Sequence, residues 1–278
     1  MSASPDTANL ALYCDFENVA LGVRDARYAQ FDISKVLERL LLKGSIVVKK
    51  AYCDWERYKE FKTAMHQASF ELIEIPHVRQ SGKNSADIRM VVDALDLCYT
   101  KSHVDTFVII SGDSDFSPLV SKLRENNKTV IGMGVKNSTS DLLIANCDEF
   151  IYYDDLVREK KPRAAPRRKS GERASASAAP VGNNVKTPAR SREDDPAQEA
   201  IDLARETYDA LVSERGAEEK IWGSMVKQAL KRRKPGFSEG YYGFSSFNKL
   251  LEEAQARHQL ELERDEKSGG YIVRAIPD

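Results

Sequence analysis

The stretch that decides the fold is "TFVIISGDSDFSPL", residues 106–119, in which an apolar run leads directly into two aspartates. Its first six residues have the β-branched and apolar character of a buried strand. Asp113 and Asp115 follow within a short polar loop, and "FSPL" then opens a helical pattern. A buried strand that ends in such a loop before a helix indicates a parallel α/β sheet.

The same alternation of strand and helix extends in both directions from this stretch. Apolar runs predict further strands at 10–14, 45–53, 70–76, 129–135 and 149–153, and helical spacing predicts helices at 32–44, 56–67, 86–100, 116–127 and 139–147. Gly44 suits the C-cap of the first of these helices. Near-continuous apolar strands of this kind are covered by helices on both faces. We therefore expect a doubly wound α/β domain over residues 1–157.

Length and composition predict two domains joined by a linker. The chain has 278 residues, which exceeds the usual size of one domain, and 41% of them are hydrophobic. Residues 158–195 are rich in Ala, Ser and Pro and hold an excess of Lys and Arg, with no aromatic residue to bury. We expect this segment to be a disordered basic linker. It is either a solvated tether or a sequence-independent contact with phosphates.

A second, smaller unit is predicted over residues 196–278. Helices are expected at 196–216, 220–237 and 245–257, and the segment 258–275 is expected to form a hairpin through its paired glycines. Three helices followed by a hairpin are typical of a winged helix-turn-helix. Within this unit we interpret four aromatic residues as core rather than as an RNA-stacking surface: Trp222, Phe237, Phe244 and Phe247.

Cysteine usage and hydropathy narrow the class of protein. The four cysteines lie far apart in apolar segments, with no C-x-x-C pair, which favours buried reduced thiols over zinc ligands or disulfides: Cys14, Cys53, Cys98 and Cys147. No apolar run suits a signal peptide or a membrane span. We therefore expect a cytoplasmic protein without a membrane partner. The 42 basic and 43 acidic residues balance, so net charge indicates no partner.

Several carboxylates are predicted to meet at one edge of the sheet. Asp15 and Asn18 follow the first strand, while Ser111, Asp113 and Asp115 follow the fourth. If these strands are neighbours, all five residues lie at the same carboxyl edge, where ligands of such sheets bind. A sixth residue, Asp87, falls in the first turn of the helix over 86–100, which Ser85 can cap. Alone, an aspartate there is commonly a favourable partner of the helix dipole.

The combination of these carboxylates predicts a metal site. Carboxylates that converge repel one another, so a cluster normally persists because a cation compensates it. With no His or Cys at these positions, the oxygen ligands favour Mg²⁺ or Mn²⁺. Such an ion activates water and stabilises a leaving oxygen, which is the chemistry of phosphodiester hydrolysis.

Four separated blocks of the sequence resemble a known family. They are "YCDFENV", "ADIRMVVDALDLCY", "FVIISGDSDFSPLVSKLRENNKTVIGMG" and "CDEFIYY", in this order. Together they are similar to the NYN family of PIN-like ribonuclease domains, over residues 9–157. The resemblance implies a metal-dependent ribonuclease, with an acidic pocket formed by Asp15, Asp87, Asp113 and Asp115, and Asn18 as the matching polar residue.

The second unit also resembles a known domain. Its segment "WGSMVKQALKRRKPGFSEGYYGFSSFNKLLEEA" is similar to the OST-HTH or LOTUS domain, a winged helix of RNA-handling proteins. A basic turn within it can contact phosphates or simply be solvated. The candidate RNA contacts are Lys227, Lys231, Arg232, Arg233 and Lys234.

The predicted function is a Mg²⁺- or Mn²⁺-dependent endoribonuclease that acts on single-stranded or structured RNA. In this hypothesis the four aspartates bind metal and activate water, and Asn18 and Ser111 orient water or phosphate. The alternative is a non-catalytic RNA-binding regulator that acts through partners. Toxin-like cleavage of transfer RNA shares the chemistry but suits an appended RNA-binding domain poorly. A homodimer, or a protein partner bound by the second unit, is also compatible with the sequence.

Overall fold

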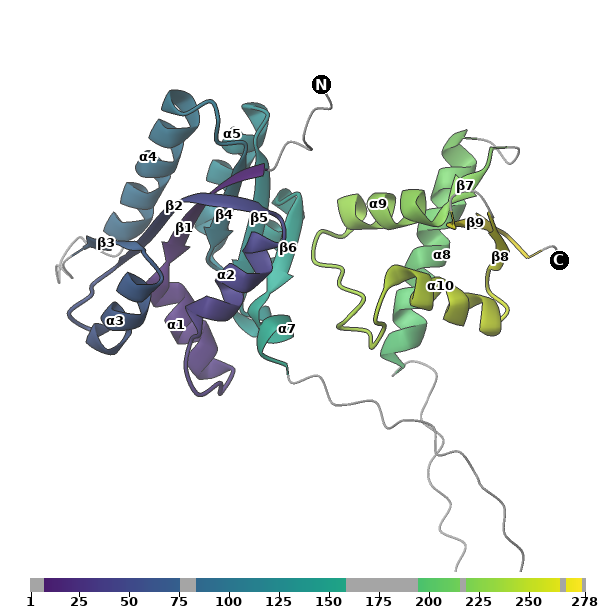
Figure 1. Ribbon diagram of the computed structural model, residues 1–278, viewed down its shortest axis with the longest axis horizontal. Coiled ribbons are helices and arrows are strands. Elements are labelled where there is room, and N and C mark those ends of the chain that lie inside the picture. The colour runs from purple at the N-terminus through teal and green to yellow at the C-terminus, as the bar shows by residue number, and fades with distance from the viewer. Residues whose placement is uncertain (1–7, 76–83, 159–194, 216–218, 266–268, 277–278) are drawn as a thin grey trace, which may run out of the picture.

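The computed structural model describes residues 8–75, 84–158, 195–215, 219–265 and 269–276, which form two units (Figure 1). The predicted linker therefore lies almost wholly outside the described residues. No helix in these ranges is long and apolar enough to cross a membrane.

The first unit is built on a six-stranded parallel sheet (Figure 1). Its strands lie in the spatial order β3 (Glu71–Glu74), β2 (Gly44–Cys53), β1 (Ala8–Asp15), β4 (Thr106–Ile110), β5 (Thr129–Gly134) and β6 (Glu149–Tyr152). Every neighbouring pair is parallel. All five residues of β4 are buried, as expected for a central strand covered on both faces.

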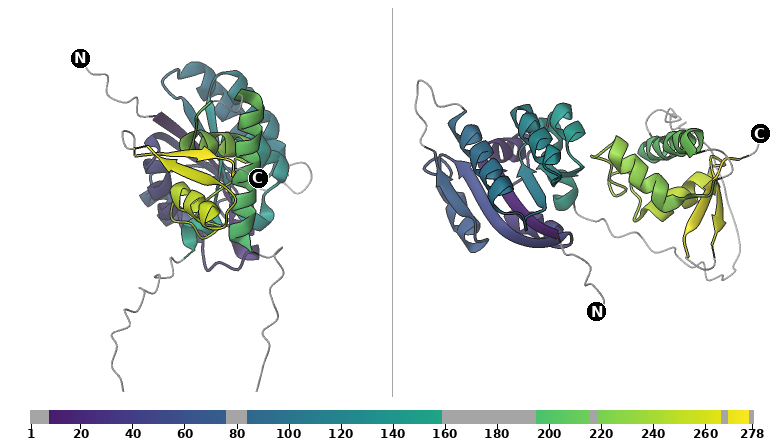
Figure 2. Two further views of the ribbon diagram at one scale, coloured as in Figure 1. Left: turned by 90° about the vertical axis from the view of Figure 1, so that its right-hand side faces the viewer. Right: turned by 90° about the horizontal axis from the view of Figure 1, so that it is seen from above.

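Helices cover both faces of this sheet, which confirms the predicted α/β architecture (Figure 2). One hydrophobic core lies under α1 (Phe16–Asp25), α2 (Ile33–Leu41), α3 (Lys59–Gln67) and α7 (Tyr153–Val157). The other lies under α4 (Ser85–Thr100), α5 (Ser117–Glu125) and α6 (Asp141–Asn146). Phe116, Leu119 and Val120 are buried in this second core and hold the start of α5 against the sheet.

Two predicted helix caps are wrong. Gly44 does not cap α2, whose C-cap is Leu42; it begins β2 instead. A Cβ at Gly44 would lie 2.1 Å from the backbone oxygen of Ala8, so glycine permits the close approach of β1 and β2. Ser85 is the first residue of α4 rather than its cap, and Asn84 occupies the N-cap without a side-chain hydrogen bond.

The cysteine prediction is confirmed, because Cys14, Cys53, Cys98 and Cys147 are all buried free thiols. Two of them point into each core, so they act as small apolar side chains on both faces of the sheet.

The second unit contains three helices and a three-stranded antiparallel sheet. Its elements are α8 (Pro196–Arg215), β7 (Ile221–Trp222), α9 (Gly223–Arg233), α10 (Phe247–Ala256), β8 (Glu261–Arg264) and β9 (Tyr271–Arg274). The sheet order is β7-β9-β8, so the short strand β7 adds to the predicted hairpin. Phe237 and Phe247 are buried and Phe244 packs beside them, whereas Trp222 is half-buried and outside the core cluster.

Candidate carboxylate site

The candidate site lies where β1 and β4 end side by side. These strands pair in parallel with Cys14 opposite Ile110, so Asp15 and Ser111 leave the sheet at the same edge. The expected adjacency of the two strands is confirmed. From here the chain order runs outward in opposite directions, through β2 on one side and β5 on the other. Ligands of parallel α/β sheets bind in the crevice at such a reversal point.

Asp15 is held at the end of β1 by two hydrogen bonds. Its Oδ1 accepts a bond from the backbone N–H of Asn18 at 3.3 Å, and its Oδ2 accepts one from the hydroxyl of Ser111 at 3.0 Å. The residue is only 7% exposed. Burial, and next the charge of Asp87, raise the pKa of Asp15 to about 7, although the two hydrogen bonds oppose this shift. The carboxyl group therefore changes its protonation state near neutral pH.

The loop after β4 is tied to the end of β1 by polar side chains. Oδ1 of Asn18 accepts a hydrogen bond from the backbone N–H of Gly112 at 2.8 Å. Oγ of Ser111 accepts one from the N–H of Asp113 at 3.2 Å, and Oδ1 of Asp113 accepts one from the N–H of Asp115 at 2.9 Å. These bonds fix the backbone of the loop and hence the place of its two carboxylates.

Asp87 reaches the same edge from the first turn of α4. Burial, and next the charges of Asp113 and Asp115, raise the pKa of Asp87 to about 6. Asp87 and Asp113 in turn both raise the pKa of Asp15. The four predicted aspartates thus lie near enough to interact electrostatically, and we call them the carboxylate rim: Asp15, Asp87, Asp113 and Asp115.

One acidic residue of this region was not predicted as part of the site. Glu17 contributes to the raised pKa of Asp87, so its charge acts on the carboxylate rim. Its carboxylate also accepts a hydrogen bond from Arg57 at 3.0 Å. The signal in the sequence is its place two residues after Asp15, in the first turn of a helix that the sequence pattern does not predict.

The donor chemistry of the rim decides which metal ion fits it. All the donor atoms that it offers are carboxylate oxygens, a type that suits Mg²⁺ or Mn²⁺. Within the described ranges, no group of three or more His, Cys, Asp or Glu side chains is arranged to hold a metal ion. Magnesium usually takes one or two carboxylates and keeps several waters. The rim therefore fits a largely hydrated ion bound by one or two aspartates, and does not fit a cage made of protein ligands alone.

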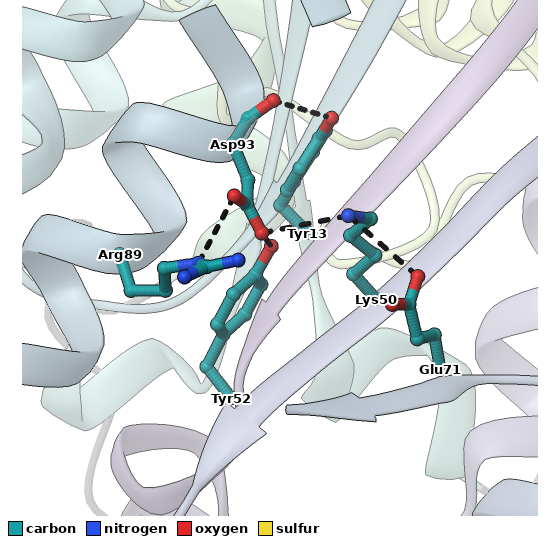
Figure 3. Close-up of polar contacts among 6 residues, drawn as sticks. All are labelled: Tyr13, Lys50, Tyr52, Glu71, Arg89 and Asp93. Atoms are coloured by element: carbon teal, nitrogen blue, oxygen red, sulfur yellow. Dashed lines mark hydrogen bonds and ion pairs between the residues drawn. The ribbon is translucent and has the colours of Figure 1, made fainter. Parts of the chain in front are cut away.

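The helix that carries Asp87 is anchored to the sheet farther along by Asp93 (Figure 3). The Asp93 carboxylate accepts hydrogen bonds from the hydroxyl of Tyr52 at 2.9 Å and from Nε of Arg89 at 3.1 Å. Nζ of Lys50 lies 3.4 Å from the same carboxylate. Asp93 therefore faces β2 rather than the rim, and joins the middle of α4 to the sheet.

The basic residues proposed from the sequence to contact RNA divide into two groups. Lys227 pairs with a carboxylate of its own unit, Lys231 lies beside a carboxylate of β6, and Arg233 donates to a hydroxyl of α8. Arg232 and Lys234 are exposed, and among the described residues no carboxylate pairs with either of them. These two side chains are the ones that remain available to a phosphate backbone.

The parallel sheet, its helical layers and the acidic edge together define an α/β domain consistent with a PIN-like fold. The profile of the NYN domain matches residues 9–154 of the chain. The chain therefore belongs to the NYN domain family, whose members are generally ribonuclease-like.

Relatives of this chain match through the same region. A meiosis regulator and mRNA stability factor of Xenopus tropicalis is 24% identical to this chain over 154 residues. The match covers 55% of this chain and 9% of that protein. An uncharacterised protein of Methanocaldococcus jannaschii is 29% identical over 47% of the chain and 54% of its own length. A protein of unknown function from Vibrio parahaemolyticus, known from a crystal structure, has 28% sequence identity and a TM-score of 0.49 to this chain. The match covers 55% of this chain and 97% of the chain in that structure.

Proposed function

We propose that this protein is a metal-dependent endoribonuclease whose C-terminal unit binds RNA. The observation that carries the proposal is the carboxylate rim, in which burial and mutual repulsion raise the pKa of Asp15 to about 7 and that of Asp87 to about 6. Carboxylates that are held close together although they repel one another are typical of a site that binds a cation. Membership of a ribonuclease-like family supports RNA as the polymer that is cut.

Each residue of the site has a distinct role in this proposal. A bound Mg²⁺ or Mn²⁺ ion supplies a Lewis acid for the phosphate and lowers the pKa of a bound water. One or two aspartates of the rim would hold the ion, and another carboxylate of the rim would accept the proton of the attacking water. Asn18 and Ser111 are already bonded to the backbone of the loop and to Asp15. We therefore assign them to positioning the carboxylates, rather than to direct contact with water or phosphate.

The C-terminal unit supplies RNA binding in this proposal. Its resemblance to the OST-HTH or LOTUS domain and its arrangement of three helices before a hairpin support an RNA-handling winged helix. Arg232 and Lys234 are both exposed at the end of α9, where each can contact a phosphate.

The decisive experiment is cleavage of a circular RNA, because an exonuclease cannot begin on a molecule without ends. The purified full chain is incubated with the circle in Mg²⁺, Mn²⁺ or EDTA. We expect metal-dependent linearisation, which falls about 100-fold or more in Asp113→Asn and Asp87→Asn. Asp96→Asn is the matched control, since Asp96 is exposed on the same helix but outside the rim. A circle that stays intact with both metals overturns the enzymatic proposal.

A non-catalytic RNA-binding regulator is the second candidate. The observation in its favour is that no three potential metal ligands of the described residues are arranged to hold an ion. This candidate predicts RNA binding that is equal in Mg²⁺ and EDTA and that persists in Asp113→Asn. Retention of binding without any cleavage would support it over the enzyme.

A further inference from the structure

The loop that follows α9 lies along β6, the edge strand of the NYN domain (Figure 1). The backbone N–H of Phe150 donates a hydrogen bond to the carbonyl oxygen of Pro235 at 3.0 Å. Farther along, Ser238 hydrogen bonds to the carboxylate of Asp155, just beyond the carboxyl end of β6. Residues 235–241, which we call the docking loop, therefore run in the same direction as this strand.

An ion-pair group joins the last turn of α9, just before the docking loop, to β6. Glu149, the first residue of β6, accepts a hydrogen bond from Nζ of Lys43 at 2.6 Å. Nζ of Lys231, at the end of α9, lies 3.7 Å from the other oxygen of Glu149. Both the Glu149 and Lys43 side chains are only 22% exposed, so solvent screens their interaction less than that of a fully exposed pair. One carboxylate of the NYN domain thus bridges two lysines, of which one belongs to the C-terminal unit.

The end of the docking loop contacts the segment that follows β5. Nζ of Lys136, which follows β5, lies 3.3 Å from the centre of the Tyr241 ring, a close cation–π contact. Four residues later, the N–H of Ser140 donates a hydrogen bond to the carbonyl oxygen of Gly112 at 2.9 Å. Gly112 directly precedes Asp113 of the rim. The segment 136–140 therefore contacts the docking loop at its beginning and the loop that carries two of the carboxylates at its end.

Gly236 shows how closely the two units fit. A Cβ built at this glycine would lie 2.7 Å from the hydroxyl oxygen of Tyr152 and 3.2 Å from two of its ring carbons. A side chain at position 236 would therefore force either the Tyr152 ring or the docking loop to shift. Gly240, in the same loop, offers a comparison, because a Cβ there would meet only Oγ of Ser238, at 3.7 Å.

We propose that the docking loop fixes the C-terminal unit against β6, so that an RNA held by this unit meets the carboxylate rim at a set distance. A unit joined only through residues 159–194 would instead sample many positions, because a long polar connection restrains its ends weakly. The part of the inference that concerns RNA rests on the proposed function, whereas the docking itself does not.

Docking is tested by energy transfer between dyes on the full chain. Ser102→Cys and Gln255→Cys place labels on exposed sites of the two units, and the four native cysteines are buried. We expect a narrow distance distribution, which Gly236→Val broadens and Gly240→Val leaves unchanged. A broad distribution in the unsubstituted chain, or a narrow one in Gly236→Val, overturns the proposal.

A second pair of variants tests the docking independently, in case Gly236→Val does not fold. Lys231→Glu places a like charge beside Glu149, whereas Arg232→Glu makes the same change of charge at the next residue, which is exposed. Both should keep the circular dichroism spectrum of the unsubstituted chain. We expect only Lys231→Glu to broaden the distance distribution, and equal behaviour of the two variants contradicts the docking.

The RNA part is tested by footprinting in EDTA, so that its outcome does not depend on cleavage. We expect one continuous protected stretch in the unsubstituted chain and a shorter or divided one in Gly236→Val. Equal footprints of the unsubstituted chain and Gly236→Val contradict the proposal that the RNA meets the rim at a set distance. The docking itself is then still decided by the dye measurement. The absence of any footprint contradicts the proposed function itself, and with it the RNA part of the inference.

Discussion

Asp15 and Asp87 hold their protons more tightly in the folded chain than in an unfolded one. The pKa of Asp15 rises from 3.8 to about 7, and that of Asp87 from 3.8 to about 6. Between about pH 4 and pH 7 the folded state therefore binds more protons than the unfolded state. By linkage, the free energy of unfolding falls as the pH rises through this window. The rim is thus a source of instability at neutral pH unless a cation is bound.

Asp15→Asn should remove the larger part of this dependence. Asn keeps the shape of the buried side chain without its charge, so we expect a gain on the order of 1–3 kcal/mol at pH 8 and little change at pH 4. Urea unfolding in EDTA at several pH values measures this effect. Asp96→Asn, on the exposed face of α4, should keep the slope of the unsubstituted chain. An unchanged slope in Asp15→Asn would contradict the assignment.

Binding of Mg²⁺ should stabilise the folded protein independently of any reaction. An ion that binds the rim of the folded chain and not the unfolded chain raises the melting temperature as its concentration rises. We expect a rise at pH 8 that is lost in the double variant Asp87→Asn and Asp113→Asn. Scanning calorimetry over a series of Mg²⁺ concentrations provides the measurement, and an equal rise in the double variant would place the ion elsewhere.

The hydrogen bonds of Asp93 position α4 against the sheet (Figure 3). Tyr52→Phe removes one hydrogen bond to a charged acceptor, so we expect a loss of about 1–3 kcal/mol in the free energy of unfolding. Tyr99→Phe is the control, because Tyr99 is 64% exposed on the same helix and should change stability by less than about 0.5 kcal/mol. Equal effects of the two variants in urea unfolding would refute this role.

The strands were predictable because the central ones read as continuous apolar runs. The predicted strand over 106–111 matches β4, and the predicted strand over 45–53 matches β2 to within one residue. The helix α1 could not be predicted in the same way, because it begins directly at the end of β1 without a polar turn between them. Its start depends on the side chain of Asp15 as a cap, and this is a contact rather than a periodicity.

In the candidate site, too, the residue types were predictable from the sequence but the contacts between distant segments were not. The types and order of the rim residues indicate convergence, since strand ends of a parallel sheet share an edge. The sequence does not indicate that Asn18 accepts a bond from the N–H of Gly112 or that Ser111 donates one to Asp15, because these bonds join segments more than 90 positions apart. Nor does it indicate that Lys231 lies beside Glu149, since that contact depends on how the two units meet.

For the whole molecule, the distribution of basic residues should determine how salt affects RNA binding. Residues 158–192 hold eleven Lys or Arg and two Glu. If these cations neutralise phosphates, replacing them with Gln at constant length should flatten the plot of log affinity against log salt. On single-stranded RNA the slope should change by about 0.7 for each phosphate that is no longer neutralised. Fluorescence anisotropy measures this slope. A slope equal to that of the unsubstituted chain would make the segment a tether only.

The hydrogen bond between Pro235 and Phe150 also bears on aggregation. A strand at the edge of a sheet presents unpaired backbone groups that can pair with another chain. Here the N–H of Phe150 is already bonded to Pro235, and proline has no N–H with which to extend a ladder. The C-terminal unit thus occupies a backbone group at the open edge of the NYN sheet. A chain that ends at residue 158 would leave β6 uncovered, and would be expected to self-associate at concentrations where the full chain does not.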